Sequence, residues 1–94
     1  MNSYDVILTP AFERDLRKLP KKIIGQILED LQILKSNPFP HGDRIKKIRT
    51  APGNSRLRSG DYRVVFRIEG NDVIVLRVFD KKDFEKILRS LHKF

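Results

Sequence analysis

The chain of 94 residues contains no cysteine and only two histidines. Without cysteine, neither a disulfide framework nor a zinc-thiolate site can form, and a reducing compartment is compatible with the composition. His41 and His92 lie far apart in the sequence, so a two-histidine metal site is not expected and both side chains are predicted to be solvated. We therefore expect neither a metal ion nor a cofactor.

Long apolar runs are also missing. The longest consecutive apolar stretches are only a few residues, and the chain does not begin with a charged segment followed by an apolar one. The sequence therefore predicts no membrane span and no secretory signal peptide, and so a cytoplasmic protein. Internal repeats, low-complexity tracts and a glycine-rich phosphate loop are absent as well.

Positive charge is what the chain has in excess. Its 20 Lys and Arg residues stand against 12 Asp and Glu residues, which gives a formal net charge of +8. This balance favours nucleic acid, a ribosome-like surface or an acidic protein as the partner, and charge alone does not choose among them. The length fits one domain, residues 1–94, with a single modest core.

The first half of the chain predicts a strand followed by two helices. Residues 4–8 alternate in the manner of a short strand, and Thr9-Pro10 supplies a helix cap and a proline at the first helical position. Pro20 ends the first helix, and the second runs from about Lys21 to Lys35. Apolar residues recur at helical spacing in both, namely Phe12, Leu16, Leu19, Ile23, Ile24, Ile27, Leu28, Leu31 and Leu34.

A proline- and glycine-containing loop, residues 37–42, closes the helical part. Residues 43–49 are predicted as either a short strand or an irregular segment that extends a basic surface. After the last strand, residues 79–83 lead into a C-terminal helix that we expect to pack on the protein's own core. Its apolar side is formed by Phe84, Ile87, Leu88 and Leu91.

Residues 56–67 predict a β-hairpin with apolar side chains on one face and arginines on the other. The apolar face of its second strand carries Tyr62, Val64, Phe66 and Ile68, and the opposite face carries Arg63, Val65 and Arg67. A two-residue turn at Gly60-Asp61 pairs Arg58 with Arg63, and Arg56 with Val65. Because opposed like charges on a sheet are mildly destabilising, this arrangement indicates an anionic ligand.

A second turn, at Asn71-Asp72, would add a third strand to this hairpin. It pairs Ile68 with Ile74, Phe66 with Leu76, Val64 with Val78 and Val65 with Arg77, and a slip of one residue would turn Arg77 into the apolar face. No Asp or Glu is expected on the basic face within the strands, whereas a merely solvated face mixes both signs. The predicted basic face carries Arg56, Arg58, Arg63, Arg67 and Arg77.

The order strand, two helices and basic meander, with Arg-Leu-Arg-Ser-Gly-Asp-Tyr-Arg-Val-Val-Phe-Arg at 56–67 and Val-Leu-Arg-Val at 75–78, resembles the RelE/ParE superfamily of toxins from type II toxin-antitoxin systems. The resemblance covers nearly the whole chain. It implies an α+β fold, in which a curved antiparallel sheet of about four strands carries two N-terminal helices on one face, with a short C-terminal helix.

The same resemblance implies two functions. RelE-like members cut mRNA in the ribosomal A site, ParE-like members poison DNA gyrase, and an antitoxin encoded beside them neutralises both. The Arg-x-Arg hairpin makes this chain more similar to the RelE side, with mRNA, the ribosome and a cognate antitoxin as partners. A gyrase inhibitor, an inactive antitoxin-binding module of the same fold and a plain nucleic-acid-binding domain are the alternatives.

RNA cleavage without a metal needs a base for the 2′-hydroxyl proton, cations for the phosphorane and an acid for the 5′-oxygen. A planar guanidinium binds phosphate through two N–H groups, so Arg63, Arg56 and Arg58 are the candidate cations. The resemblance matches Arg63 to an arginine associated with activity. Lys81 and Lys82 are candidates for proton transfer, because a lysine crowded by cations loses its proton more readily. Further RNA-binding candidates are Arg67, Arg77, Lys46, Lys47, Arg49 and Phe84, the last by stacking on a base.

Two positions depart from the RelE-like pattern. Asn54 and Arg56 stand where many such sequences have lysines, and Phe84-Glu85 stands where a tyrosine is often found. An obvious proton-transfer residue is therefore missing. Glu85 could act as a base, but a carboxylate near a helix start also fits the helix dipole, and the ribosome is an alternative source of proton-transfer groups.

Overall fold

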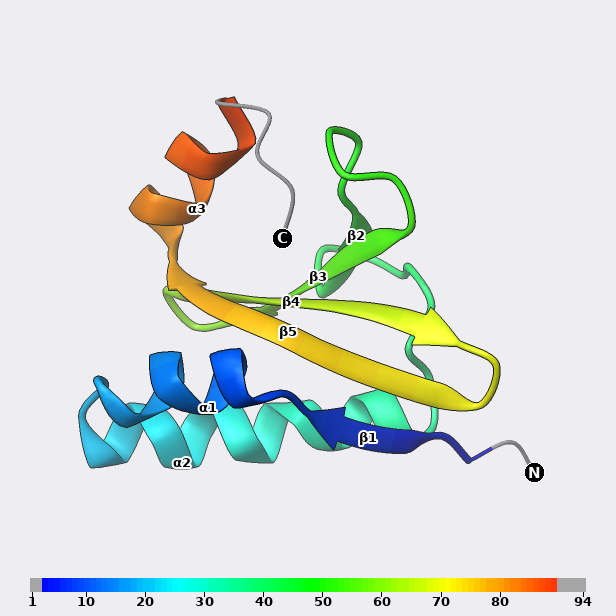
Figure 1. The fold of residues 1–94 in the computed structure, drawn as a ribbon, viewed down its shortest axis with the longest axis horizontal. Helices are drawn as coiled ribbons and strands as arrows, with labels where there is room; N and C mark the ends of the chain where they lie inside the picture. Colours follow the sequence, from blue (N-terminus) through cyan, green and yellow to red (C-terminus); the bar gives the residue numbers. More distant parts are fainter. Residues whose placement is uncertain (1–2, 90–94) are drawn as a thin grey trace.

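The computed structural model describes residues 3–89 and shows a five-stranded sheet with helices on both faces (Figure 1). The strand order is β1-β5-β4-β3-β2. The strands are β1 (Asp5–Leu8), β2 (Ile45–Lys47), β3 (Asn54–Ser59), β4 (Tyr62–Glu69) and β5 (Asp72–Asp80). Helices α1 (Pro10–Arg17) and α2 (Lys21–Asp30) lie on one side of the sheet, and α3 (Lys81–Arg89) lies on the other. The predicted α+β fold is confirmed.

The sheet differs from the expected one in strand number and direction. It has five strands rather than about four, and β1 runs parallel to β5, with Asp5 opposite Asp72 and Leu8 opposite Val75. A helical crossover and the whole meander separate these two strands in sequence, so no hairpin forces them to run antiparallel. The fifth strand is β2, which pairs antiparallel with β3. Of the two predictions for residues 43–49, a short strand or an irregular segment, the strand is therefore the correct one.

The N-terminal helices begin as predicted, but the second ends early. The Thr9 hydroxyl accepts a hydrogen bond from the Phe12 amide at 3.2 Å and donates one to the Val75 carbonyl at 2.8 Å, so one side chain caps α1 and ties it to β5. Beyond α2 the chain tightens into a 3₁₀ helix, η1 (Leu31–Lys35). The 3₁₀ turn places Leu31 and Leu34 on the same side, where both are buried.

Two hydrophobic clusters lie on opposite faces of the sheet. The main core lies under α1, α2 and η1, and Tyr62 and Ile68 pack against it on the apolar face of β4, as the alternation predicted. Its largest fully buried side chains include Phe12, Ile27, Leu34, Leu57, Val64, Phe66, Val73 and Val75. A smaller cluster on the other face joins Val65 to Ile48, Ala51 and Phe84. The expected packing of the C-terminal helix on the protein itself is thus confirmed, while Leu91 lies outside the described residues.

The β4–β5 register was only half correctly predicted. The turn lies at Gly70-Asn71, one residue earlier than expected, and Gly70 has a φ of 60° that suits a tight hairpin turn. Phe66 therefore pairs with Val75, and Ile68 with Val73, instead of Leu76 and Ile74. A β-bulge between Val65 and Phe66 absorbs one extra residue, so the predicted pairs Val64–Val78 and Val65–Arg77 are present beyond it.

Within residues 3–89, no helix is long and apolar enough to cross a membrane.

Candidate functional site

The β3–β4 hairpin gathers three arginines beside its turn, and we call Arg56, Arg58 and Arg63 the arginine trio. Arg58 lies opposite Arg63 and Arg56 lies opposite Val65, which confirms the predicted pairing. Nη1 of Arg63 donates to the carbonyls of Gly60 and Tyr62, each at 3.0 Å. These two bonds hold the guanidinium beside the turn.

The turn itself is seated on α2. Gly60 has a φ of +57°, and a Cβ built there would come within 2.6 Å of the Gln26 side-chain nitrogen. Behind the turn, the Ser59 hydroxyl donates to Asp30 at 2.6 Å, and Arg44 donates to the same carboxylate at 3.0 Å. Because the Arg58 amide also donates to the Arg44 carbonyl at 2.8 Å, the backbone that presents Arg58 is fixed from behind.

The electrostatics of the trio favour an anion. Burial, followed by the charges of Arg56 and Arg58, lowers the pKa of the half-buried Arg63 guanidinium from its ordinary value, while Asp61 and Glu85 act in the opposite direction. An arginine remains charged at neutral pH, so the trio holds positive charges that repel one another. A bound phosphate would relieve that repulsion and accept hydrogen bonds from the guanidinium N–H groups.

Helix α3 covers the middle of the basic face. Phe84 is 3% exposed and packs in the smaller cluster with Val65, and the Arg56 guanidinium carbon lies 5.8 Å from the centre of its ring. The expectation that Phe84 stacks on an RNA base does not fit this arrangement, because the ring is already buried. Its place in the structure is to dock α3 beside the arginine trio.

Lys81 and Lys82 lie in the first turn of α3 rather than in an extended basic turn. Asp80 caps this helix by accepting from the Asp83 amide at 2.9 Å, and the Lys81 amide donates to the Asp61 carbonyl at 2.8 Å. Both lysines are exposed and line, with Asp61 and Tyr62, an open cavity of about 510 Å³. The structure therefore brings them to the hairpin turn that carries the trio.

A groove lined by basic residues extends from the trio along β2. Lys46 lies opposite Arg56, and Lys47 opposite Ser55 on the other face of the sheet. Lys46, Lys47 and Arg49 line, together with Arg56 and Leu88, a groove of about 280 Å³. Arg56, Lys46 and Arg49 thus lie along one groove that leads away from the hairpin, and Lys47 borders it from the other face of the sheet.

The remaining two arginines of the predicted face have acidic partners. Arg67 forms an ion pair with Glu69, which belongs to the same strand and the same face. Arg77 is bound by Asp15 of α1, with Nε–Oδ2 at 2.6 Å and Nη2–Oδ1 at 3.0 Å. The expectation that this face carries no acid within the strands is therefore wrong for Glu69, and the pairing of Arg77 with Asp15 was not predicted.

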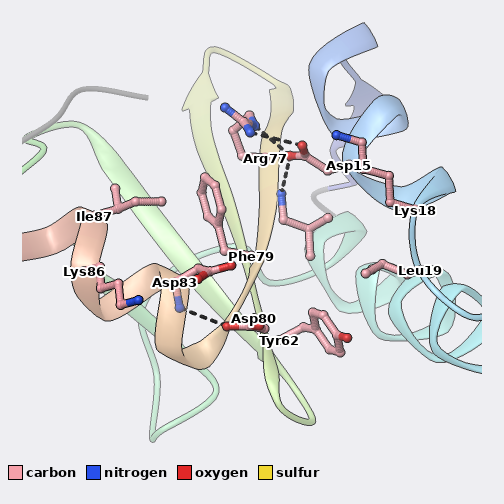
Figure 2. A pocket seen from close by; sticks show the side chains of 11 residues that line it. Asp15, Lys18, Leu19, Tyr62, Arg77, Phe79, Asp80, Asp83, Lys86 and Ile87 are labelled. Carbon is pink, nitrogen blue, oxygen red and sulfur yellow. Dashed lines mark hydrogen bonds and ion pairs between the residues drawn. The ribbon is translucent and has the colours of Figure 1, made fainter.

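Pairing with β1 ends at Val75, and beyond that point Asp15 of α1 binds the free edge of β5. Figure 2 shows Asp15 beside Arg77. Besides holding Arg77, its carboxylate accepts the Val78 amide at 3.1 Å, in the position a neighbouring strand's carbonyl would take. The hydrogen bonds that Arg77 donates to the Asp15 carboxylate raise the pKa of Arg77 above its ordinary value. A group whose pKa is higher in the folded than in the unfolded state stabilises the protein fully at pH values below its unfolded-state pKa. The stabilisation by the Arg77–Asp15 pair is therefore complete at neutral pH and is lost only in strong alkali.

We expect Asp15→Ala to lower the free energy of unfolding by about 1–3 kcal/mol, because the Val78 amide and the Arg77 guanidinium both lose their acceptor. Urea titration at neutral pH measures the loss. Glu13→Ala is the matched control, since Glu13 is an exposed acid on the same helix. An equal loss in both variants would mean that helix charge, and not the capped strand edge, carries the effect.

Among residues 3–89, no three His, Cys, Asp or Glu side chains gather where they could hold a metal ion.

Known proteins share this fold and much of this sequence. A family model described as the ParE toxin of the type II toxin-antitoxin system parDE matches residues 6–84. Toxin RelG of Mycobacterium tuberculosis is 34% identical over 83 residues, which cover 85% of this chain and 93% of that protein. Two solved structures, both toxin-antitoxin complexes, match the fold along most of the chain.

The first is the complex RelBE2 from Mycobacterium tuberculosis, with a TM-score of 0.72 and 31% identity over 83% of this chain and 98% of that chain. The second is the archaeal RelE-RelB complex from Pyrococcus horikoshii OT3, with a TM-score of 0.71 and 25% identity over 84% of this chain and 96% of that chain. The family model, the similar toxin sequence and the solved structures all indicate the same family as the hairpin motif. The chain belongs to the RelE/ParE superfamily of toxins from type II toxin-antitoxin systems.

Proposed function

We propose that this toxin is a ribosome-dependent endoribonuclease that cuts mRNA by attack of a 2′-hydroxyl on the adjacent phosphate. The observation that carries the proposal is the arginine trio, in which Arg58 faces Arg63 across the hairpin and Arg56 lies two pairs further along, on the same face of the sheet. Opposed arginines are unfavourable without a ligand, and a polyanion removes that cost.

The trio suits the transition state better than the ground state. In-line attack gathers extra negative charge on the phosphorane oxygens, and preorganised cations in a partly dry site stabilise that charge most. Arg63 is fixed by its two bonds to the turn, so its guanidinium needs little rearrangement. The groove of Lys46, Lys47 and Arg49 binds the neighbouring phosphates, and the products are a 2′,3′-cyclic phosphate and a 5′-hydroxyl.

The test is cleavage of a defined mRNA by the purified toxin, with and without programmed ribosomes. We expect cuts only with ribosomes, and none when a 2′-deoxy nucleotide replaces the one that attacks. Intact mRNA on ribosomes at an excess of toxin would overturn the proposal. RNA that binds with strong salt dependence but stays uncut would instead favour a simple nucleic-acid-binding domain.

A cognate antitoxin is the proposed protein partner, because the related structures are toxin-antitoxin complexes. An acidic, amphipathic segment fits the trio and its basic groove, and it would either cover them or displace α3. Co-expression with the product of a neighbouring small open reading frame should restore growth. Failure to form a complex would remove this partner without deciding the activity.

Gyrase inhibition is the second candidate, because the family model that matches residues 6–84 is a ParE toxin. It needs the same fold but no proton-transfer residue, and it predicts loss of supercoiling by purified gyrase at stoichiometric toxin. Full supercoiling at a large excess of toxin would exclude it. The two assays therefore separate the two functions on one protein preparation.

A further inference from the structure

The arginine trio explains how charge is stabilised, and Lys81 and Lys82 stay candidates for proton transfer at the hairpin turn, but neither has been matched to the proton on the 2′-hydroxyl. The aromatic and imidazole groups that could take it lie elsewhere in the part of the chain that the structure describes. Tyr62 packs against the main core, on the face of the sheet opposite the trio. Tyr4 packs edge-on against Phe39, with the two ring centres 5.8 Å apart. His41 binds the Phe39 carbonyl through Nδ1 at 2.7 Å, beside β2.

Helix α3 brings one carboxylate to the trio. Its first residue, Lys81, is anchored by its amide to the Asp61 carbonyl in the hairpin turn. Glu85 follows four residues later, so it lies on the same face of the helix about one turn, roughly 5.4 Å, further along. Its neighbour Phe84 is buried beneath Arg56, which fixes this stretch of helix over the sheet.

Electrostatics place Glu85 in the field of the trio as well. Its negative charge acts on the Arg63 guanidinium and opposes the lowering of that pKa by burial and by Arg56 and Arg58. Asp61 acts on Arg63 in the same direction, and more strongly, from the hairpin turn itself, whereas Glu85 reaches the trio from α3, the helix whose Phe84 packs beneath Arg56. Glu85 is exposed, so its carboxylate is open to substrate.

We propose that Glu85 is the general base of this active site. The inference rests on the proposed endoribonuclease function and names the proton acceptor for it. The Glu85 carboxylate takes the proton from the 2′-hydroxyl while the 2′-oxygen forms its bond to phosphorus. The bond from phosphorus to the 5′-oxygen breaks, water protonates that oxygen, and Glu85 afterwards returns its proton to water.

The arrangement suits a base in two ways. A carboxylate oxygen can accept a proton directly, and the Glu85 side chain lies on an exposed turn of the helix. The arginine trio beside it binds the phosphate that the 2′-hydroxyl attacks. The β3–β4 hairpin and α3 together therefore orient the base and the phosphate toward each other.

The experiment compares Glu85→Gln with the wild-type toxin in single-turnover cleavage of mRNA on programmed ribosomes. We expect a rate lower by about 100-fold or more, since a positioned base contributes about 10²–10⁴-fold. Affinity for ribosomes carrying a 2′-deoxy substrate should stay within about twofold, because the amide keeps the size of the side chain. Glu85→Asp should recover part of the rate. Glu29→Gln, an exposed acid on α2, is the matched control and should match the wild type.

The pH dependence gives a second readout. The wild-type rate should fall as the pH is lowered through the acidic range, where the carboxylate gains a proton, and this limb should be absent from Glu85→Gln. The charged groups on the elements that pack beside this part of α3 are those of the hairpin, of β2 and the loop after it, and of α3 itself, namely Arg56, Arg58, Asp61, Arg63, Lys46, Lys47, Arg49, Lys81, Lys82, Asp83, Lys86 and Arg89. All of them are kept in Glu85→Gln, so a limb that disappears in this variant belongs to Glu85.

Three results would overturn the inference. An unchanged rate and pH profile in Glu85→Gln would remove Glu85 from the mechanism and leave the endoribonuclease function intact. Equal losses in Glu85→Gln and Glu85→Asp, together with a lower melting temperature in both, would assign it a structural role in α3. A wild-type toxin that leaves mRNA intact on ribosomes would overturn the proposed function itself, and the base with it.

Discussion

Arg63→Ala is expected to lower the rate of mRNA cleavage by about 100- to 1,000-fold, the loss seen when one preorganised donor to a developing oxyanion is removed. Arg63 is the member of the trio that both other arginines repel, and two backbone carbonyls fix its guanidinium. Single-turnover cleavage on programmed ribosomes measures the rate. Induced expression should then no longer arrest growth.

The variant should remain folded, and the reason lies in the sign of the pKa shift. A lowered pKa for Arg63 means that the folded state disfavours its charged form, so at neutral pH this charge costs stability. Removing it relieves the repulsion from Arg56 and Arg58. Thermal unfolding of Arg63→Ala should therefore occur at the wild-type temperature or above, which excludes misfolding as the cause of lost activity.

Two further variants separate position from charge. Arg63→Lys keeps the charge but loses the planar two-point contact with phosphate, and we expect an intermediate rate. Arg67→Ala removes the same charge from the same strand and face, but Arg67 is paired with Glu69. It should weaken RNA binding and leave the rate at saturating ribosomes nearly unchanged. Equal damage by Arg67→Ala and Arg63→Ala would mean that net charge alone drives activity.

The sequence predicted the arginine hairpin correctly because the information there is local. The turn at Gly60-Asp61 fixes which residues face each other, and the alternation from Tyr62 to Arg67 has an apolar residue at every core position. The β4–β5 register had no such guide. Residues 73–76 are Val-Ile-Val-Leu, so either face of that stretch can be buried. A one-residue bulge therefore still places apolar residues on the buried face, and the sequence does not reveal it.

The acids of the site escaped prediction because tertiary contacts, and not chain neighbours, give them their roles. Asp15 meets Arg77 across 62 positions of sequence. A signal was present, since Asp15 follows Phe12 by three residues and so lies near the buried side of α1, where a charged residue needs a partner. Glu85 was visible as a possible base, but only the packing of Phe84 beneath Arg56 shows that this stretch of α3 lies beside the hairpin.

Phe84→Ala is expected to remove about 3 kcal/mol from the docking of α3, the usual loss for a buried phenylalanine. The ring is 3% exposed and belongs to the smaller cluster, which shares the sheet with the main core but lies on its other face. Because Phe66 and its neighbours on the main-core face keep their contacts, the sheet should stay folded while α3 opens. Hydrogen exchange should show the amides of α3 losing protection, and those of β3 to β5 keeping it.

The same variant tests whether α3 is part of the active site. Undocking the helix moves Glu85 away from Arg63 and takes the aromatic ring from beneath Arg56, so cleavage should fall about as far as in Glu85→Gln while the arginine trio remains in place. Phe66→Ala is the matched control, since Phe66 is fully buried in the main core and its loss should lower protection throughout the sheet. Uniform loss of protection in Phe84→Ala would show that α3 folds in one cooperative unit with the sheet. Full activity with an opened α3 would show that the sheet alone cuts RNA.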